Sequence, residues 1–165
     1  MLNPYSQAFL SIQHNSADSN SLSNNDVRAV LEDWSGDLWI GTWGGGLNHY
    51  DPETETFTIY KNDPGDPDSL SNDRIFSLFE DREGVLWIGF SSGGLDRLDP
   101  AIEDGFAARF PHNLYDLANP NSLSNNDVTA LYEDSTGILW VGTWIGGLNA
   151  LDRQTEDGNI RFSRY

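Results

Sequence analysis

The chain has 165 residues, with 26 acidic against 9 basic side chains and a formal net charge of −17 at pH 7. Nucleic acids and anionic membrane surfaces are bound by clustered Lys and Arg, so this composition argues against both partners. The sequence has no Cys, which excludes disulfides and cysteine-based metal sites. No stretch approaches the roughly 20 apolar residues of a membrane helix, so we expect no membrane insertion by this chain. Residues 1–15 show no signal peptide, and the sequence itself indicates no compartment.

The N-terminal residues 1–19 are predicted to be the end of a repeat whose beginning is absent. Phe9 lies 12 residues before Ser21, and the same spacing separates an aromatic residue from the start of each later repeat. We therefore expect residues 8–12 to form the last strand of a preceding unit, followed by a link.

The first complete unit, residues 20–68, contains four segments with the side-chain period of a β-strand. Apolar residues alternate over residues 27–31, and residues 38–43 are apolar on both faces, as in a strand between neighbouring sheets. Residues 46–51 alternate again, and residues 56–61 hold β-forming residues at their central positions. The unit is therefore predicted to be a four-stranded antiparallel meander.

The second unit, residues 69–121, and the third, residues 122–165, repeat this pattern. Their shared hexapeptide is Gly-x-Leu-Trp-(Ile/Val)-Gly, whose three copies are 48 and 53 residues apart. Self-similarity at such a period marks a chain of stacked supersecondary units. The longer spacing reflects extra residues around 102–108, which we expect in a surface loop.

A repeated four-stranded meander of about 50 residues is the blade of a β-propeller. We therefore predict an all-β fold, a propeller segment of three four-stranded antiparallel blades plus one extra N-terminal strand. Blades need residues that wedge between sheets and residues that allow close approach. We assign these roles to the repeated Trp and Gly residues: Trp39, Trp87 and Trp140; Gly41, Gly89 and Gly142.

The sequence resembles the two-component regulator propeller repeat over residues 20–165. The resemblance is carried by the patterns Asn-Ser-Leu-Ser-Asn-Asn-Asp-Val, Glu-Asp-x-x-Gly-x-Leu-Trp-Ile-Gly-Thr and Gly-Gly-Leu-Asn-x-x-Asp. It implies the ligand-sensing, usually periplasmic, region of hybrid sensor kinases, whose ligands are often oligosaccharides. The chain shows no kinase, receiver or DNA-binding segment, so the resemblance does not supply a signal output.

Three blades are too few to close a ring, because propellers typically have about 4–8. Two interpretations stay open. In the first, the chain is a fragment of a longer propeller whose other blades are in cis. In the second, another chain supplies them, with residues 9–12 completing or covering a partner's sheet edge.

A ligand is expected at the edge that collects the turns between second and third strands and the links between blades. Flat aromatic residues beside polar and charged side chains suit a small molecule or an oligosaccharide. The alternative is that the aromatic residues only pack against neighbouring blades. The candidate residues are Trp43, Trp144, Asn25, Asp26, Arg28, Asp73, Arg74, Asn126 and Asp127.

No enzyme activity, cofactor or metal is predicted. His14, His49 and His112 occupy non-equivalent positions in their repeats, and no nucleophile motif is present. The acid-rich residues 63–73 lack the pattern of a calcium loop. Paired acids recur at a turn in every blade, which indicates structure. The alternatives are a protein–protein interaction scaffold, and a propeller glycosidase or lyase that uses a pair of rim carboxylates.

Overall fold

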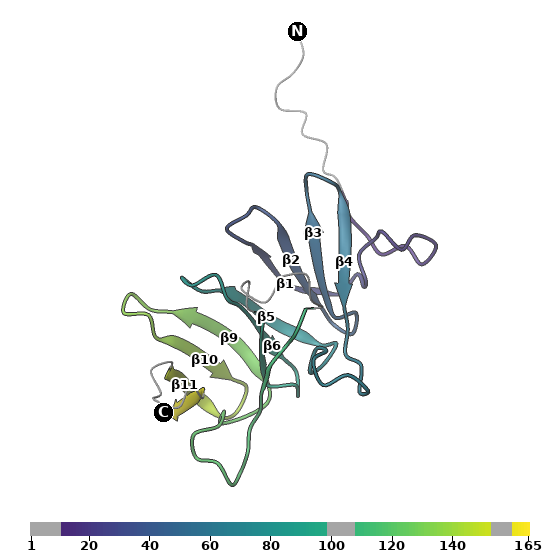
Figure 1. The fold of residues 1–165 in the computed structure, drawn as a ribbon. Helices are drawn as coiled ribbons and strands as arrows, with labels where there is room; N and C mark the ends of the chain where they lie inside the picture. The colour runs from purple at the N-terminus through teal and green to yellow at the C-terminus, as the bar shows by residue number, and fades with distance from the viewer. Residues whose placement is uncertain (1–10, 99–107, 153–159) are drawn as a thin grey trace.

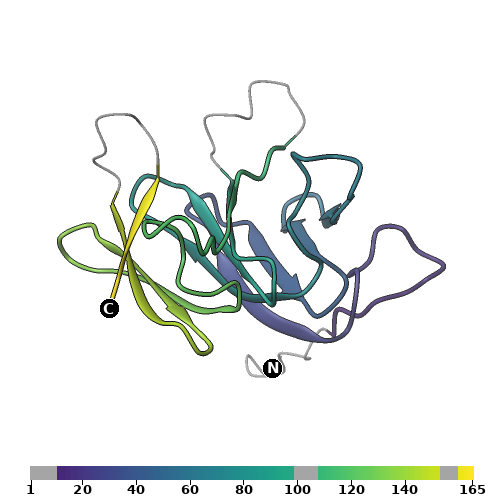
Figure 2. The ribbon, with the colours of Figure 1, turned by 90° about the horizontal axis from the view of Figure 1, so that it is seen from below.

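The computed structural model describes residues 11–98, 108–152 and 160–165. Within these ranges the chain forms three four-stranded antiparallel sheets and no helix, which confirms the all-β propeller-segment prediction. Figure 1 shows the sheets side by side in an arc, with the sheet of β5 and β6 between the other two. The view from below in Figure 2 shows the same succession.

Each sheet follows chain order, as a meander requires. The first sheet consists of β1 (Val27–Glu32), β2 (Leu38–Thr42), β3 (Leu47–Asp51) and β4 (Thr56–Tyr60). The second consists of β5 (Ile75–Glu80), β6 (Leu86–Phe90), β7 (Leu95–Leu98) and β8 (His112–Asn113). The third consists of β9 (Val128–Glu133), β10 (Leu139–Thr143), β11 (Gly147–Asp152) and β12 (Arg161–Arg164).

The fourth strand of the second sheet is shorter than its counterparts. β8 has two residues, whereas β4 has five and β12 has four. Pro111 directly precedes β8 and has no amide hydrogen for the ladder, which is why proline is confined to strand starts and edges. Phe110 still enters the core with 2% of its surface exposed, and its amide donates to the Asp68 carbonyl at 2.9 Å.

The hairpin between the first two strands of each sheet is closed by one aspartate. In the first sheet, Asp33 Oδ1 accepts hydrogen bonds from the Ser35 and Asp37 amides at 2.9 and 3.0 Å. Its Oδ2 accepts the indole N–H of Trp39 at 2.8 Å. Gly36 has φ of +95°, a left-handed conformation that suits glycine in such a turn. The indole bond recurs from Trp87 to Asp81 at 2.6 Å and from Trp140 to Asp134 at 2.8 Å.

Tryptophan side chains fill the spaces between successive sheets. Trp39 is 6% exposed and belongs to a core cluster with Leu86 and Phe90 of the second sheet. Trp87 is 2% exposed and packs with Val128 and Val141 of the third sheet. The predicted wedge role is therefore confirmed for these two residues. Trp140 is only half-buried, because no further sheet follows it among the described residues.

The repeated glycines lie where the first strands of neighbouring sheets come together, since β1 contacts β5 and β5 contacts β9. A Cβ on Gly41 would collide with the Ile75 side chain of the second sheet. A Cβ on Gly89 would lie 2.7 Å from Val128 Cγ1 and 2.9 Å from its carbonyl oxygen. These two glycines therefore permit the close approach of blades, as predicted.

The predicted N-terminal strand falls mostly on residues 8–10, which lie outside the described residues, and residues 11–12 are not in a strand. The expected loop at 102–107 also lies outside them. The link before each first strand does repeat. The amides of His14, Asn62 and Tyr115 donate to Asn25, Asp73 and Asn126 Oδ1, at 2.7, 2.8 and 2.6 Å. These bonds recur at the same place in each repeat, and the division at residues 19, 68 and 121 stays a proposal.

Candidate functional site

The loop rim is the edge formed by the β2–β3, β6–β7 and β10–β11 turns and by the segments that lead into β1, β5 and β9. Each turn is fixed to the segment leading into the first strand of its own sheet. The amides of Trp43, Ser91 and Trp144 donate to the carbonyls of Asp26, Arg74 and Asp127 at 2.8, 2.9 and 2.9 Å. Eight of the nine predicted site residues therefore lie on this edge, and the ninth, Arg28, lies in β1 with its guanidinium over the Trp43 ring.

The first and second sheets meet at the rim through the β2–β3 turn. The amides of Gly44 and Gly46 donate to the Asp73 carbonyl at 2.9 and 3.1 Å, and Trp43 forms an isolated antiparallel bridge with Arg74. The segment leading into β5 is thus hydrogen-bonded to the β2–β3 turn of the preceding sheet.

Trp43 is half-buried at this junction, and two guanidinium groups lie over its ring. The Arg28 and Arg74 Cζ atoms are 5.2 and 5.5 Å from the ring centroid, and the Phe76 ring lies 5.2 Å away. Arg28 is also paired with Asp26, through Nε–Oδ1 and Nη2–Oδ2 contacts of 2.7 and 3.0 Å. Arg74 is exposed, and its guanidinium has no acidic partner among the described residues. The structure therefore brings four predicted residues, Trp43, Asp26, Arg28 and Arg74, into one cluster.

The other predicted residues are used in different ways. The side-chain oxygens of Asn25, Asp73 and Asn126 accept amide hydrogen bonds from their own links, as described above, so these three residues hold the backbone. Asp127 Oδ1 accepts the Ser92 amide at 2.9 Å at the second junction. Trp144 is 73% exposed on the third sheet, and the structure does not place it beside Trp43.

A polar pocket of about 280 Å³ adjoins the rim between the second sheet and the links. Its lining includes Asn62, Ser71, Ser92, His112 and Asn126. Of these, only Asn126 was predicted as a site residue. The predicted edge of turns and links covers the segments that hold Asn62 and Ser92, but the sequence did not single out these side chains.

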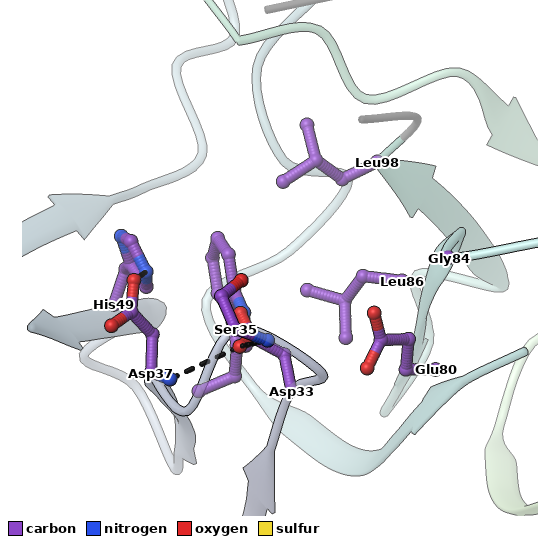
Figure 3. Close-up of a pocket in the computed structure, with 9 residues that line it drawn as sticks. Asp33, Ser35, Asp37, His49, Glu80, Gly84, Leu86 and Leu98 are labelled. Carbon is purple, nitrogen blue, oxygen red and sulfur yellow. Dashed lines mark hydrogen bonds and ion pairs between the residues drawn. The ribbon is translucent and has the colours of Figure 1, made fainter. Parts of the chain in front are cut away.

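A second pocket, of about 140 Å³, lies at the opposite edge between the first and second sheets. Figure 3 shows Asp37 and His49 on one side of it, with Leu86, Leu98 and Glu80 on the other. His49 Nε2 lies 2.9 Å from Asp37 Oδ2, and the imidazole stacks on the Trp39 ring at 4.2 Å.

Ligand atoms of Asp33, Asp37 and His49 lie within 4.8 Å of one another, close enough to suggest a cation site. However, both Asp33 oxygens already accept hydrogen bonds from the turn and from Trp39. Burial raises the pKa of Asp33, but these hydrogen bonds outweigh it and leave the pKa below its usual value. Because both carboxylate oxygens of Asp33 are already used in hydrogen bonds, we assign no metal to this cluster of three residues.

Glu80 is an acid on the other side of this pocket, next to Leu86. Burial is the main cause that raises the pKa of Glu80, and the nearby Asp33 and Asp81 charges add to it, against the hydrogen bond from the Trp34 amide. That 3.0 Å bond from Trp34 to Glu80 Oε2 is matched in the next sheet by the Arg82 amide and Glu133 Oε2 at 3.0 Å. Glu80 and Glu133 therefore each bind the hairpin of the preceding sheet to their own sheet, a structural role that recurs.

An arc of meandering sheets with tryptophan wedges between them and first strands side by side defines a segment of a β-propeller. The family described as two component regulator propeller matches residues 21–44, 69–92 and 122–146. Each of the three sheets thus contains one segment that matches this repeat, over its first two strands.

Solved structures of B. thetaiotaomicron sensor proteins show the same arrangement. The extracellular domain of the hybrid two-component system BT3049 is 25% identical with a TM-score of 0.75, over 93% of this chain and 20% of that one. Two structures of the BT4673 extracellular domain, described once as a hybrid two-component and once as a one-component system, are each 25% identical. Their TM-scores are 0.68 and 0.65, over 91% and 90% of this chain and 20% and 19% of theirs.

This chain therefore spans about a fifth of the length of the sensor domains it matches. No match was found among curated proteins. In the described part of the chain, no helix is long and apolar enough to cross a membrane.

Proposed function

We propose that this chain is part of the ligand-sensing propeller of an extracytoplasmic receptor, and that its loop rim contacts an oligosaccharide without catalysis. The similar structures are extracellular domains of signalling systems, which supports the sensing role and the location. The observation that carries the proposal is the pair of exposed guanidinium groups flanking Trp43 at the rim.

The chemistry of this cluster suits a polyhydroxylated ligand. A guanidinium presents a fork of N–H donors to hydroxyl or carboxylate oxygens, and an indole supplies apolar surface next to them. Because Trp43 is half-buried under Arg28 and Arg74, we expect it to orient the two guanidiniums and offer its exposed edge, rather than a full ring face, to the sugar.

The proposal that the chain is not an enzyme is supported by the acids of the pocket at the opposite edge. Asp33 and Glu80 have counterparts that make the same structural hydrogen bonds in other blades. Asp37 and His49 have no acidic or imidazole counterparts, but they are paired with each other.

A glycan array, followed by calorimetry on any glycan bound, tests the proposal on the 165-residue chain. Arg74→Ala leaves the backbone bonds of residue 74 in place and should weaken binding by about tenfold or more, the cost of one hydrogen bond to a charged group. Trp43→Ala should weaken it as well. The control is Trp34→Ala, because Trp34 lies at the opposite edge, where it is 70% exposed. Wild-type affinity in a folded Arg74→Ala variant would show that the rim cluster is not the site.

A second proposed role, association with further blades, is supported by the outer sheet faces. Leu47 and Leu95 are 0% exposed because the next sheet covers them, whereas the equivalent Leu148 is 41% exposed. On the first sheet Val30 is 62% exposed. Unpaired apolar sheet faces ordinarily drive association, although the net charge of −17 opposes contact between two copies, most strongly at low salt.

Size-exclusion chromatography with light scattering, over a range of protein and salt concentrations, tests this role. Leu148→Glu should reduce association, while Leu117→Glu, at an 86% exposed link position, should not. Deletion of residues 8–12 tests the strand-exchange form specifically. An unchanged oligomeric state after that deletion would rule out exchange of this strand.

A further inference from the structure

The second blade buries an acid at a position where the other two blades bury an amide. Asp96 in β7, Asn48 in β3 and Asn149 in β11 are all 0% exposed. Each is paired in register with the equivalent residue of the preceding strand, namely Ile88, Ile40 and Val141. The three sites therefore share one geometry and differ in one functional group.

The amide serves as both acceptor and donor. Asn48 Oδ1 accepts the Ser23 amide at 2.8 Å, while its Nδ2 donates to Ser23 Oγ at 2.8 Å and to the Ile40 carbonyl at 3.1 Å. Asn149 makes the same bonds to Ser124 and Val141, at 2.9, 2.9 and 3.1 Å. In both blades this side chain anchors the segment that leads into the first strand.

Asp96 keeps only the acceptor half of this pattern when it is ionised. Its Oδ2 accepts the Ser71 amide at 2.8 Å and its Oδ1 accepts the Ser71 hydroxyl at 2.5 Å. A carboxylate has no hydrogen to give to a strand carbonyl, whereas a neutral carboxyl group has one O–H. The neutral acid can therefore supply one of the two donors that asparagine supplies in the sister blades.

The surroundings also favour the neutral form. Burial raises the pKa of Asp96 to about 7, and the Ser71 hydrogen bonds and the His112 charge oppose this only in part. His112 on β8 faces the carboxyl group, with Nε2 3.9 Å from Oδ2, and also lies 2.7 Å from the Ser69 carbonyl. The link beyond contributes Asp63 and Asp66 to the adjoining pocket.

We propose that Asp96 is a proton-sensitive latch on the segment of residues 71–74 that leads into β5. The neutral carboxyl group is buried without a charge, as the Asn48 amide is. Ionisation strengthens the two Ser71 hydrogen bonds but places a carboxylate at a position with no access to water, and opening of the segment restores that access. The same segment carries Asp73 and Arg74, which build the rim junction at Trp43, so ionisation loosens one wall of the ligand site. This last step rests on the proposed ligand-binding function, whereas the latch does not.

Hydrogen exchange of the residue 71–75 amides across about pH 5 to 8, corrected for intrinsic rates, tests the latch. A folded-state pKa above the unfolded value means that the stabilisation is complete below about pH 4 and is lost as pH rises toward 7. Protection in the wild type should fall over this range, by at most about tenfold per pH unit. Asp96→Asn should fold, because the sister blades use asparagine, and its protection should not fall.

Two further variants sharpen the test. Asn48→Asp should transfer the pH dependence to the residue 23–26 amides, and a variant unfolded near neutral pH should regain structure in acid. His112→Gln removes a charge that lowers the Asp96 pKa, so the fall in protection should persist with a midpoint at higher pH. Identical pH profiles for wild type and Asp96→Asn would overturn the latch. Because exchange needs no ligand, absence of glycan binding bears only on the proposed function.

Discussion

A matched pair of glycine substitutions tests whether contact between blades, rather than the strand itself, requires glycine. Gly89 and Gly142 occupy equivalent positions in β6 and β10. An added Cβ at Gly89 meets the Ser77 hydroxyl of its own sheet, whose side chain can rotate, and Val128 of the next sheet, 2.7 Å from Cγ1 and 2.9 Å from the carbonyl oxygen. At Gly142 the nearest atom is Ala130 Cβ of the same sheet, at 3.3 Å.

These distances predict a large loss of stability at one glycine and little change at the other. The Gly89→Ala methyl group meets a backbone atom that cannot move aside, and such overpacking costs about 1–3 kcal/mol. Gly142→Ala requires a shift of a few tenths of an ångström, and it also removes unfolded-state entropy worth roughly 0.4–1 kcal/mol. The two variants should therefore differ by about 1–3 kcal/mol, with Gly142→Ala close to wild type.

Urea unfolding followed by tryptophan fluorescence measures the difference, at protein concentrations low enough to prevent association. Comparable destabilisation by the two variants would refute the reasoning, because β10 has no following sheet among the described residues. A loss of association by Gly142→Ala at high concentration would instead identify this glycine as a contact point for another blade.

The remaining predictions concern the core, the hairpin turns and acid stability. Leu95→Ala should cost about 2–5 kcal/mol of unfolding free energy in urea titrations, and the exposed counterpart Leu148→Ala under about 1 kcal/mol. Asp81→Ala removes the acceptor of the Glu83, Val85 and Trp87 hydrogen bonds, so thermal unfolding should show a loss of about 2–4 kcal/mol. Hydrogen bonds from Thr136 and Trp140 are the main causes that lower the pKa of Asp134. The Asp134 carboxylate therefore contributes to the free energy of unfolding above the unfolded pKa of about 3.9, and this contribution is lost as pH falls. Asp134→Asn should flatten the acid side of a curve of stability against pH, measured by urea unfolding.

The sequence predicted the strands well because the pattern that indicates each strand lies within the residues of that strand. Residues 27–31, 38–43, 46–51 and 56–61 were expected as strands, and β1 to β4 occupy them within about two residues, the usual uncertainty of strand ends. The exception is β8, where Pro111 removes a donor from the ladder. The missing amide hydrogen shortens the strand only where the neighbouring strand would accept a hydrogen bond from that position, which the tertiary structure decides.

The candidate site was only partly predictable. The sequence placed nine residues on one edge because the meander topology fixes which turns and links share it. It did not indicate that Asn25, Asp73 and Asn126 accept hydrogen bonds from the links that precede them. The periodicity of side chains does not predict a hydrogen bond to an amide 11 residues away. The pocket of Asp37 and His49 was missed for the same reason.

The sequence by itself determined the repeat, the number of strands in each unit and the residues that wedge between blades, because these follow from period and composition. Only the tertiary structure decided what each copy does. Trp87 is buried and Trp140 half-buried, and Leu95 is covered while Leu148 is exposed. The physical reason is that burial belongs to a pair of neighbouring sheets, whereas the repeated sequence describes one sheet at a time.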